Sequence, residues 1–390
     1  MRNFVFHNPT RVYFGRGQAA ALEEELRGRF GKVLLVTGGG SVRKNGVLDD
    51  VISRIKRAGA GYVELQGVCP NPRLESVYEG IDIARKGSVD LILPVGGGSV
   101  IDAAKAIAAG VPYEGDVWDF FEKGVAPEKA LPVGTVLTLA ATGSEMNSNA
   151  VITREDARRK LAMSSPLIQP VFSVLDPAYT CTVNRYHTAA GVADIMAHVF
   201  EYYFNPTSHA EVQDALAEAL LGICVKFGPV VCDEPWNYDA RANILWASSL
   251  ALSGIVGRGK ISDWTCHGIE HEISAICDIS HGAGLAIILP PFMKVLCEKY
   301  GPGRIAGYGE AVWGLKKDGD MDGAAVETIE RTRSFFDSLG LPSNLKEAGI
   351  RAEHIGLIAE NTVRERAVFD DLIQLSEEDI RRVLRSALRS

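Results

Sequence analysis

The chain has 390 residues, 46% of them hydrophobic and 23% charged, with a formal net charge of -8 at pH 7. These values are typical of a globular protein long enough for two or three domains. The negative charge argues against nucleic acid or a membrane surface as a partner. No run of 18 apolar residues and no N-terminal signal pattern is visible, so we expect no membrane span and no secretion. Seven cysteines without a CxxC motif fit reduced thiols in a cytosolic protein better than a disulfide framework, so a cytoplasmic protein is the default expectation that these facts do not by themselves select.

The first half of the chain alternates short apolar runs with helical patterns. We predict two short strands within residues 3–14, around a turn at His7 to Pro9. Further strands are predicted at 32–37, 62–66, 89–95 and 133–139, with shorter strand-like runs at 149–153 and 171–176. Helical patterns separate the main runs. This alternation predicts a mainly parallel sheet with right-handed crossover connections.

The pattern changes after Pro177, where strand-type runs become scarce. Long segments with apolar residues at a spacing near 3.6 take their place, at 209–227, 238–256 and 324–340. We therefore predict an α/β domain over residues 1–180 and an all-helical domain over residues 181–390.

A glycine-rich phrase, GGGS at 96–99, follows the third of the main strands and opens a helix. Glycine lets the backbone approach a ligand closely, and the free N–H groups at a helix start attract phosphate. Ser99 adds a hydroxyl, and Asp102 in the first turn would contact a ribose or nicotinamide group. The alternative is a tight strand-to-helix turn with nothing bound, because glycine loops are common. The phrase LTLAATGSE offers further hydroxyls at Thr138 and Thr142.

A second GGGS phrase, at 38–41, bears on the choice of cofactor. In nicotinamide sites an acidic side chain at a strand end commonly accepts a hydrogen bond from the ribose 2'-hydroxyl. This phrase has no carboxylate to repel a 2'-phosphate, and Arg43 and Lys44 follow it. If the loop meets the adenosine ribose, it favours NADP(H) over NAD(H). Otherwise Arg43 and Lys44 belong to a solvated helix face.

Four of the eight histidines lie in two phrases, GVADIMAHVFE and CHGIEHEISAICDISHG. Asp194 and His198 are four residues apart, as are His267 and His271, so each pair shares one face of a helix. Such pairs can hold a divalent ion, although a buried Asp–His hydrogen bond is the alternative for the first pair. Spacing alone favours these four residues as ligands, with His281 as a capping or substrate-side residue. It does not decide which of the three later histidines stays off the metal.

Taken together, these phrases resemble the iron-containing (group III) alcohol dehydrogenases. The joint match also includes FHNPTRVYFGRG, VTGGGSVRKNGVL and LPVGGGSVIDAAK, and it covers the chain to about residue 291. The greatest similarity is to the branch of NADP-dependent butanol dehydrogenases and broad-range aldehyde reductases. The chain departs at LTLAATGSE, where many family members have PTTAGTGSE, which blurs which threonines contact the cofactor.

The resemblance implies an α/β domain with a dinucleotide-binding sheet, a helical metal-binding domain of dehydroquinate synthase-like architecture, and an active site between them. It implies one divalent ion, Fe2+ or Zn2+, held by Asp194, His198, His267 and His281. His271 is then the catalytic residue near the nicotinamide and the substrate. The resemblance also implies a homodimer.

The same resemblance implies where NADP(H) binds. The implied contact residues are Gly38, Gly39, Gly40, Ser41, Asn71, Gly97, Gly98, Ser99, Asp102, Thr138, Thr142 and Lys160. The 2'-phosphate would lie by Gly39, Gly40 and Ser41. NAD-using relatives carry an Asp in this loop, and this chain does not.

The predicted reaction is hydride transfer between NADP(H) and a small primary alcohol or aldehyde, in the direction of aldehyde reduction. The metal would act as a Lewis acid and His271 as a proton relay. The alternative is a non-redox lyase or cyclase of the dehydroquinate synthase type, which uses a Glu and two His as ligands and a basic pocket. A binding module without catalysis would leave a nucleotide loop and a ligand set unexplained. Mostly apolar candidates for the substrate pocket are Met146, Asn147, Val151, Trp264 and Ile279.

Overall fold

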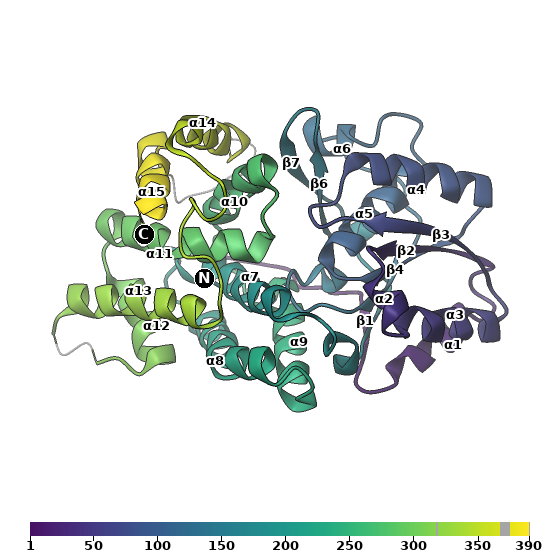
Figure 1. Cartoon of the computed structure of the whole chain (residues 1–390), viewed down its shortest axis with the longest axis horizontal. Helices are drawn as coiled ribbons and strands as arrows, with labels where there is room; N and C mark the ends of the chain where they lie inside the picture. Colours follow the sequence, from purple (N-terminus) through teal and green to yellow (C-terminus); the bar gives the residue numbers. More distant parts are fainter. Residues whose placement is uncertain (317–318, 367–374, 390) are drawn as a thin grey trace. The chain divides into compact units, whose positions relative to one another are not determined.

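The computed structural model describes residues 1–316, 319–366 and 375–389. The chain divides into two compact units, drawn in Figure 1. The sheet unit comprises His7–Val183 and Pro235–Ser249, and the helical unit comprises Met1–Phe6, Asn184–Glu234 and Leu250–Ser390. The sequence predicts a single division after residue 180. In the structure, one short segment from each half of the chain belongs to the other half's unit.

Six strands form the sheet of the sheet unit. In the order in which they lie side by side, they are β1 (Arg11–Phe14), β8 (Phe172–Leu175), β5 (Gly134–Leu137), β4 (Leu91–Gly96), β2 (Lys32–Gly38) and β3 (Gly61–Val68). Every neighbouring pair is parallel, and β2 pairs with β4 from Val33–Leu91 to Thr37–Val95. The carboxyl ends of all six strands therefore meet at one edge. The predicted parallel sheet is confirmed.

Helices cover both faces of this sheet, as Figure 1 shows. On one face, α4 (Leu74–Gly87) and α5 (Gly98–Gly110) share a hydrophobic core with Leu34 of β2. On the other face, α1 (Ala21–Leu26) and α3 (Val47–Ala58) share a core with Leu35, the next residue along that strand. Adjacent strand residues point to opposite faces, which explains why the strands are apolar throughout.

The connections after β2 and β4 lie on opposite faces of the sheet. The chain passes from β2 through α2 (Ser41–Lys44) and α3 to β3, and from β4 through α5 to β5. These two adjacent strands therefore flank the point at which the order of the strands reverses. Open α/β sheets bind their ligands in the crevice beyond the carboxyl ends of the strands at such a point.

Three smaller features complete the sheet unit. Strands β6 (Asn149–Arg154) and β7 (Arg159–Ser164) form a separate antiparallel pair, and α6 (Asp119–Glu122) is a single turn. Helix α9 (Tyr238–Leu252) packs Leu245 into an apolar cluster with residues of α5, β5 and β8. The sequence does not predict β7, because the strand begins with two charged residues.

The predicted strand before His7 is wrong. Residues 1–10 contain no helix or strand, and Phe4, Val5 and Phe6 are exposed. These first residues belong to the helical unit, in whose described residues no strand is present to pair with them. An apolar run needs a neighbouring strand as well as strand-forming residues, since an isolated strand leaves its backbone groups unbonded.

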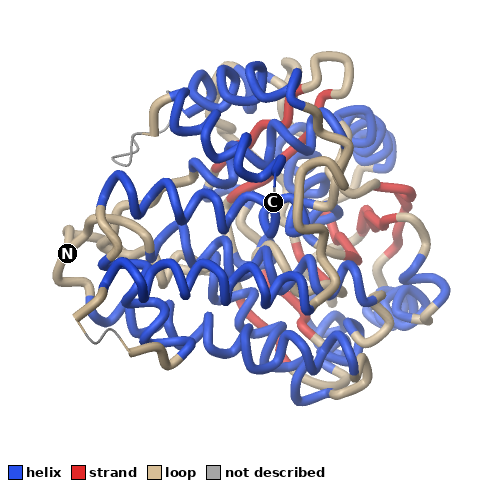
Figure 2. Tube along the Cα trace, turned by 60° about the vertical axis from the view of Figure 1, so that its left-hand side comes forward, coloured by secondary structure: helices blue, strands red, loops and turns tan. Residues whose placement is uncertain are grey.

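The helical unit consists of helices joined by loops, blue and tan in Figure 2. Its helices are α7 (Arg185–Tyr203), α8 (Glu211–Asp233), α10 (Thr265–Cys277), α11 (His281–Tyr300), α12 (Gly303–Trp313), α13 (Met321–Ser338), α14 (Ile355–Arg366) and α15 (Glu377–Arg389). Helix α7 packs against α8 and α11, and it is buried over most of its length. It begins at Asn184, whose side chain accepts a hydrogen bond from His187 N at 2.9 Å, as is typical of an N-cap. The predicted all-helical second domain is confirmed.

Helix α8 is, among the described residues, the one helix that length and composition would allow to cross a membrane. Of its most apolar window, 33% is buried in the structure. One such helix is weak evidence for a membrane span, because core helices of soluble proteins have similar length and composition.

Candidate functional site

Helix α7 carries Asp194 and His198 on one face, four residues apart. Both side chains are buried, and His198 Nδ1 lies 3.3 Å from Asp194 Oδ1. Burial, together with the neighbouring ring of His267, lowers the pKa of His198 well below its ordinary value of 6.5. This histidine is therefore neutral at pH 7, which is the form of imidazole that binds metal ions.

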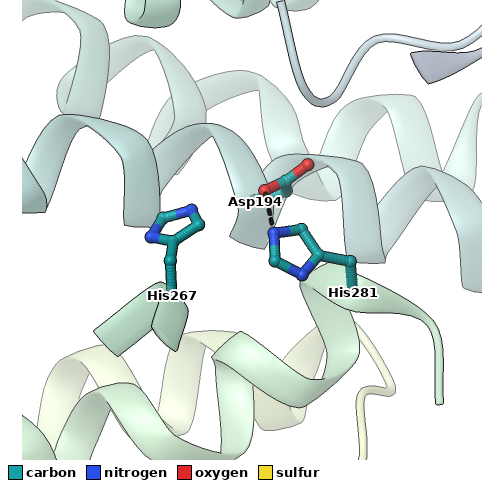
Figure 3. A group of neighbouring side chains, drawn as sticks. All are labelled: Asp194, His267 and His281. Carbon is teal, nitrogen blue, oxygen red and sulfur yellow. Dashed lines mark ion pairs between the residues drawn. The ribbon is translucent and has the colours of Figure 1, made fainter. Parts of the chain in front are cut away.

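Asp194, His267 and His281 come together from α7, α10 and α11, as Figure 3 shows. One ligand-type atom of each residue lies within 4.8 Å of those of the other two, and His281 Nε2 is 3.7 Å from Asp194 Oδ1. Small rotations of the side chains would bring atoms at these separations onto one ion at the bond lengths of about 2.0–2.2 Å typical of nitrogen and oxygen ligands. A carboxylate and imidazoles also suit Fe2+ and Zn2+ by type. The residues present therefore fit a divalent metal ion.

Gly282 permits the close approach of α11 to α7. A Cβ atom at this position would lie 1.9 Å from the carbonyl oxygen of Ala190 and 3.1 Å from Asp194 Cβ. No rotation of a side chain relieves a clash with backbone. The glycine after His281 thus allows this histidine, the first residue of α11, to reach Asp194.

Two buried glutamates contact the histidines through Nδ1. Glu201 Oε1 lies 2.7 Å from His267 Nδ1 and also accepts a hydrogen bond from His267 N at 3.0 Å. Glu270 Oε2 is hydrogen-bonded to His281 Nδ1. Both glutamates are buried, with exposures of 4% and 0%. Sequence reasoning missed both, although each follows a candidate ligand histidine by three residues and so lies on the same helix face.

His271 lies beside this group. Its ring centroid is 5.5 Å from that of His281, and its ring joins Glu270 and His281 in a second group of ligand-type atoms within 4.8 Å. His198 lies close by as well, with its ring centroid 4.6 Å from that of His267. The group that contains Asp194 and His267 has His281 as its third member, and neither His271 nor His198 belongs to it. Which histidines bind the metal stays a prediction.

The predicted cofactor residues gather at the carboxyl edge of the sheet unit. The glycine loops follow β2 and β4, Asn71 follows β3, and both Thr138 and Thr142 follow β5. These four strands are neighbours, so their loops lie side by side. Thr138 N donates to Gly96 O at 3.0 Å and joins two of the loops. Lys160 lies on β7, where its side chain is buried.

The start of α5 fits the pyrophosphate of a dinucleotide. No side chain among the described residues caps the N-terminus of α5. The first N–H groups of the helix and its positive end therefore suit an anion. A Cβ atom on Gly98 would lie 2.2 Å from Thr142 Oγ1. Glycine is therefore needed for the loop after β4 to pack against the loop after β5.

A buried hydrogen-bond network lies beside these loops. The Nζ of Lys105 donates to Ser144 Oγ at 2.9 Å, to Asn147 Oδ1 at 3.0 Å, and to the carbonyl oxygens of Asn147 and Asn149 at 2.9 and 2.8 Å. Asp102 accepts from Ser144 Oγ at 2.6 Å and from Val151 N at 3.1 Å.

Both carboxylate oxygens of Asp102 thus hold the segment after β5, and its predicted cofactor contact stays a prediction. Burial lowers the pKa of Lys105 to about 8, a shift that the charges of Asp102 and Glu145 oppose.

Residues 9–177 match the family described as iron-containing alcohol dehydrogenase, and residues 188–388 match the C-terminal part of the Fe-containing alcohol dehydrogenase family. The chain is 43% identical over 388 residues to NADH-dependent butanol dehydrogenase A of Clostridium acetobutylicum, covering 99% of this chain and 100% of that protein. It is 40% identical over 360 residues to the NADPH-dependent aldehyde reductase YqhD of Escherichia coli, covering 91% of each. The crystal structure of NADH-dependent butanol dehydrogenase A from Thermotoga maritima matches with a TM-score of 0.95 at 40% identity, covering 100% of this chain and 99% of that one.

Proposed function

Because this chain belongs to the iron-containing alcohol dehydrogenase family, we propose that it reduces small aldehydes to primary alcohols with NADPH. The family and the relatives support a metal-dependent oxidoreductase acting on alcohols and aldehydes. They do not favour the non-redox lyase, because the matched families and relatives are alcohol dehydrogenases or aldehyde reductases. By family resemblance we also propose a cytoplasmic homodimer.

The observation that carries the proposal is the grouping of Asp194, His267 and His281. With His198 on the same face of α7 as Asp194, these residues would hold one divalent ion, Fe2+ or Zn2+. When bound, the ion would supply Lewis-acid polarisation of the carbonyl oxygen. The chain's own part is to hold the donors in place. Trp264 packs edge-on against His267, with ring centroids 5.2 Å apart, and so limits the freedom of that ring.

We assign proton transfer to His271. Its side chain is partly exposed, and its ring lies beside His281 rather than in the group with Asp194. An imidazole can hold or release a proton near neutral pH. His271 would therefore deliver a proton from water to the product oxygen from one of its ring nitrogens.

The cofactor would bind at the carboxyl edge of the sheet unit and would supply the hydride. The start of α5 would hold the pyrophosphate, and the loop from Gly38 to Ser41 would hold the 2'-phosphate. This loop has no carboxylate, which supports NADP(H). Arg43 is paired with Glu64, so we attribute the preference to Ser41 and the backbone N–H groups rather than to Arg43. Among the relatives named above, the two butanol dehydrogenases are described as NADH-dependent and the aldehyde reductase as NADPH-dependent.

The reaction is tested by a screen of NADPH oxidation with aldehydes of graded length, on protein reconstituted separately with Fe2+ and Zn2+. We expect aldehyde-dependent oxidation that requires the metal. Two variants sharpen the test. His281→Ala should lose both metal and activity, whereas His271→Ala should keep the metal and lose rate. A protein that binds metal but oxidises NADPH with no aldehyde in the series would contradict the proposed activity.

The cofactor preference is tested at Gly39, where a side chain meets no atom within 4 Å and the backbone φ is not positive. Gly39→Asp adds a carboxylate without strain, and Gly39→Asn adds the same shape without the charge. We expect the ratio of kcat/KM for NADPH to that for NADH to fall at least about tenfold in the Asp variant, equivalent to ~1.4 kcal/mol. An equal ratio in the Asp and Asn variants would show that this loop does not read the 2'-phosphate.

A further inference from the structure

We propose that Glu201 and Glu270 are positioning residues, each fixing one metal-binding histidine in the tautomer and orientation that direct Nε2 at the ion. The inference rests on the metal centre of the proposed function. It adds two carboxylates that contact the histidine rings on the side away from the ion. Glu201 contacts Nδ1 of His267, and Glu270 contacts Nδ1 of His281. Metal-binding histidines generally donate their other ring N–H to a carboxylate, a carbonyl or water.

Glu201 is bound to His267 at two points. The same oxygen, Oε1, accepts from the backbone N of His267 at 3.0 Å and lies 2.7 Å from its Nδ1. The backbone bond places the oxygen relative to α10, so the ring cannot turn without losing a buried contact. An ionised carboxylate only accepts hydrogen bonds. Nδ1 must therefore carry the proton, which leaves the lone pair of the ring on Nε2.

Glu270 contacts the ring of His281 and is itself held by a second hydrogen bond. Its Oε2 is hydrogen-bonded to His281 Nδ1, while its Oε1 accepts a hydrogen bond from Ser274 Oγ one turn along α10. A Cβ atom on Gly284 would lie 2.9 Å from both Cγ and Oε1 of Glu270. A second glycine of α11 thus makes room for this carboxylate, and Nε2 of His281 lies on the Asp194 side, 3.7 Å from Asp194 Oδ1.

The two contacts link three helices in sequence. A glutamate of α7 holds the histidine of α10, and a glutamate of α10 holds the histidine of α11. Each histidine is therefore oriented from a different helix from the one that carries it. The two buried carboxylates also add negative charge around a doubly charged cation and raise the basicity of the imidazoles.

The inference is tested by the Zn2+ affinity of the full-length protein, measured by competition with a chromogenic chelator. Glu201→Ala and Glu270→Ala should each weaken Zn2+ binding about 10–100-fold. Glu201→Gln and Glu270→Gln keep an acceptor oxygen without the charge and should recover part of the loss. The matched control is Glu272→Gln. Glu272 is also buried on α10, but it accepts a hydrogen bond from Asn361 Nδ2 at 2.8 Å, and the Zn2+ affinity of this variant should equal that of the wild type.

The nitrogen chemical shifts of the histidine rings give a readout that a purely structural role would not move. In zinc-free wild type we expect His267 and His281 as tautomers protonated at Nδ1, and in the alanine variants a mixture. Wild-type Zn2+ affinity in both alanine variants would overturn the inference while leaving the metal centre intact. A wild-type protein that binds no Zn2+ would overturn the metal centre itself. If an alanine variant does not fold, the glutamine variant at that position decides, and wild-type affinity there overturns the inference.

Discussion

Each unit of the molecule has a buried cluster of polar side chains. The cluster of the sheet unit contains a cationic side chain, and the cluster of the helical unit consists of carboxylates and imidazoles. In the sheet unit, the ammonium group of Lys105 donates to four oxygen atoms and lies near the Asp102 carboxylate. In the helical unit, Asp194 and the imidazoles of His267 and His281 converge as ligand-type atoms, with two further carboxylates behind the rings.

The two clusters differ in whether the chain itself pairs the buried polar groups. A buried charge costs free energy unless it is paired, and the Lys105 network matches donors with acceptors within the chain. The helical unit instead brings electron-pair donors together at one point. This arrangement fits a bound metal ion rather than a cationic side chain. Substitutions in each cluster and removal of the metal should therefore have different effects on stability and on zinc binding.

The largest effect is expected from Gly282→Ala. The new Cβ would lie 1.9 Å from the carbonyl oxygen of Ala190, so α11 must move away from α7 and take His281 with it. We expect a loss of more than about 4 kcal/mol in the free energy of unfolding and the loss of bound zinc, measured by urea unfolding and metal analysis. The matched control is Gly222→Ala on α8, where a Cβ meets nothing within 4 Å. This control should be neutral or stabilising by up to about 1 kcal/mol. Bound zinc at the wild-type level in Gly282→Ala would contradict the explanation.

Lys105→Met should destabilise the protein by about 3–5 kcal/mol, because it removes the positive charge near the buried Asp102 carboxylate and leaves four oxygens of the buried network without their donor. The Zn2+ affinity should not change, since the network belongs to the sheet unit alone. Urea unfolding and chelator competition on the same samples check both statements. Lys86→Met serves as the control, because Lys86 is an exposed residue that pairs with the exposed Asp82, and its change should stay within about 0.5 kcal/mol. If the Lys105→Met variant were as stable as the wild type, the hydrogen-bond network would not stabilise the fold.

Removing the metal should have the smallest of the three effects. Zinc at 100 times its dissociation constant stabilises the folded state by about 2.7 kcal/mol, and a chelator in excess should remove that contribution. The difference in Tm with and without chelator measures it. Lys105→Met should keep this difference, and His281→Ala should abolish it. An identical response in the wild type and His281→Ala would show that the zinc effect arises elsewhere.

The main elements of the fold could be predicted from the sequence because each carries its own periodic pattern. The buried strands β2 and β4 and the helix start after each are visible as apolar runs ending in glycines. The strand predicted before His7 and the missed strand β7 show where this reasoning fails. An edge or hairpin strand is stabilised by pairing with its neighbour. Its own residues therefore need not show a strand-like sequence pattern.

The kinds of side chain in the candidate site could be predicted without coordinates. Residues four apart on one helix must share a face, so Asp194 and His198 could be paired from the sequence alone. A glycine loop after a buried strand leaves the N–H groups of a helix start accessible, which is compatible with a bound phosphate. Packing between helices is needed to see that His281 lies with Asp194 and His267, and that Glu201 and Glu270 contact the Nδ1 atoms of the two histidines. Helical periodicity fixes relations within one helix. The grouping of His281 with Asp194 depends on how closely two helices pack, and that distance is set by Gly282 at their contact.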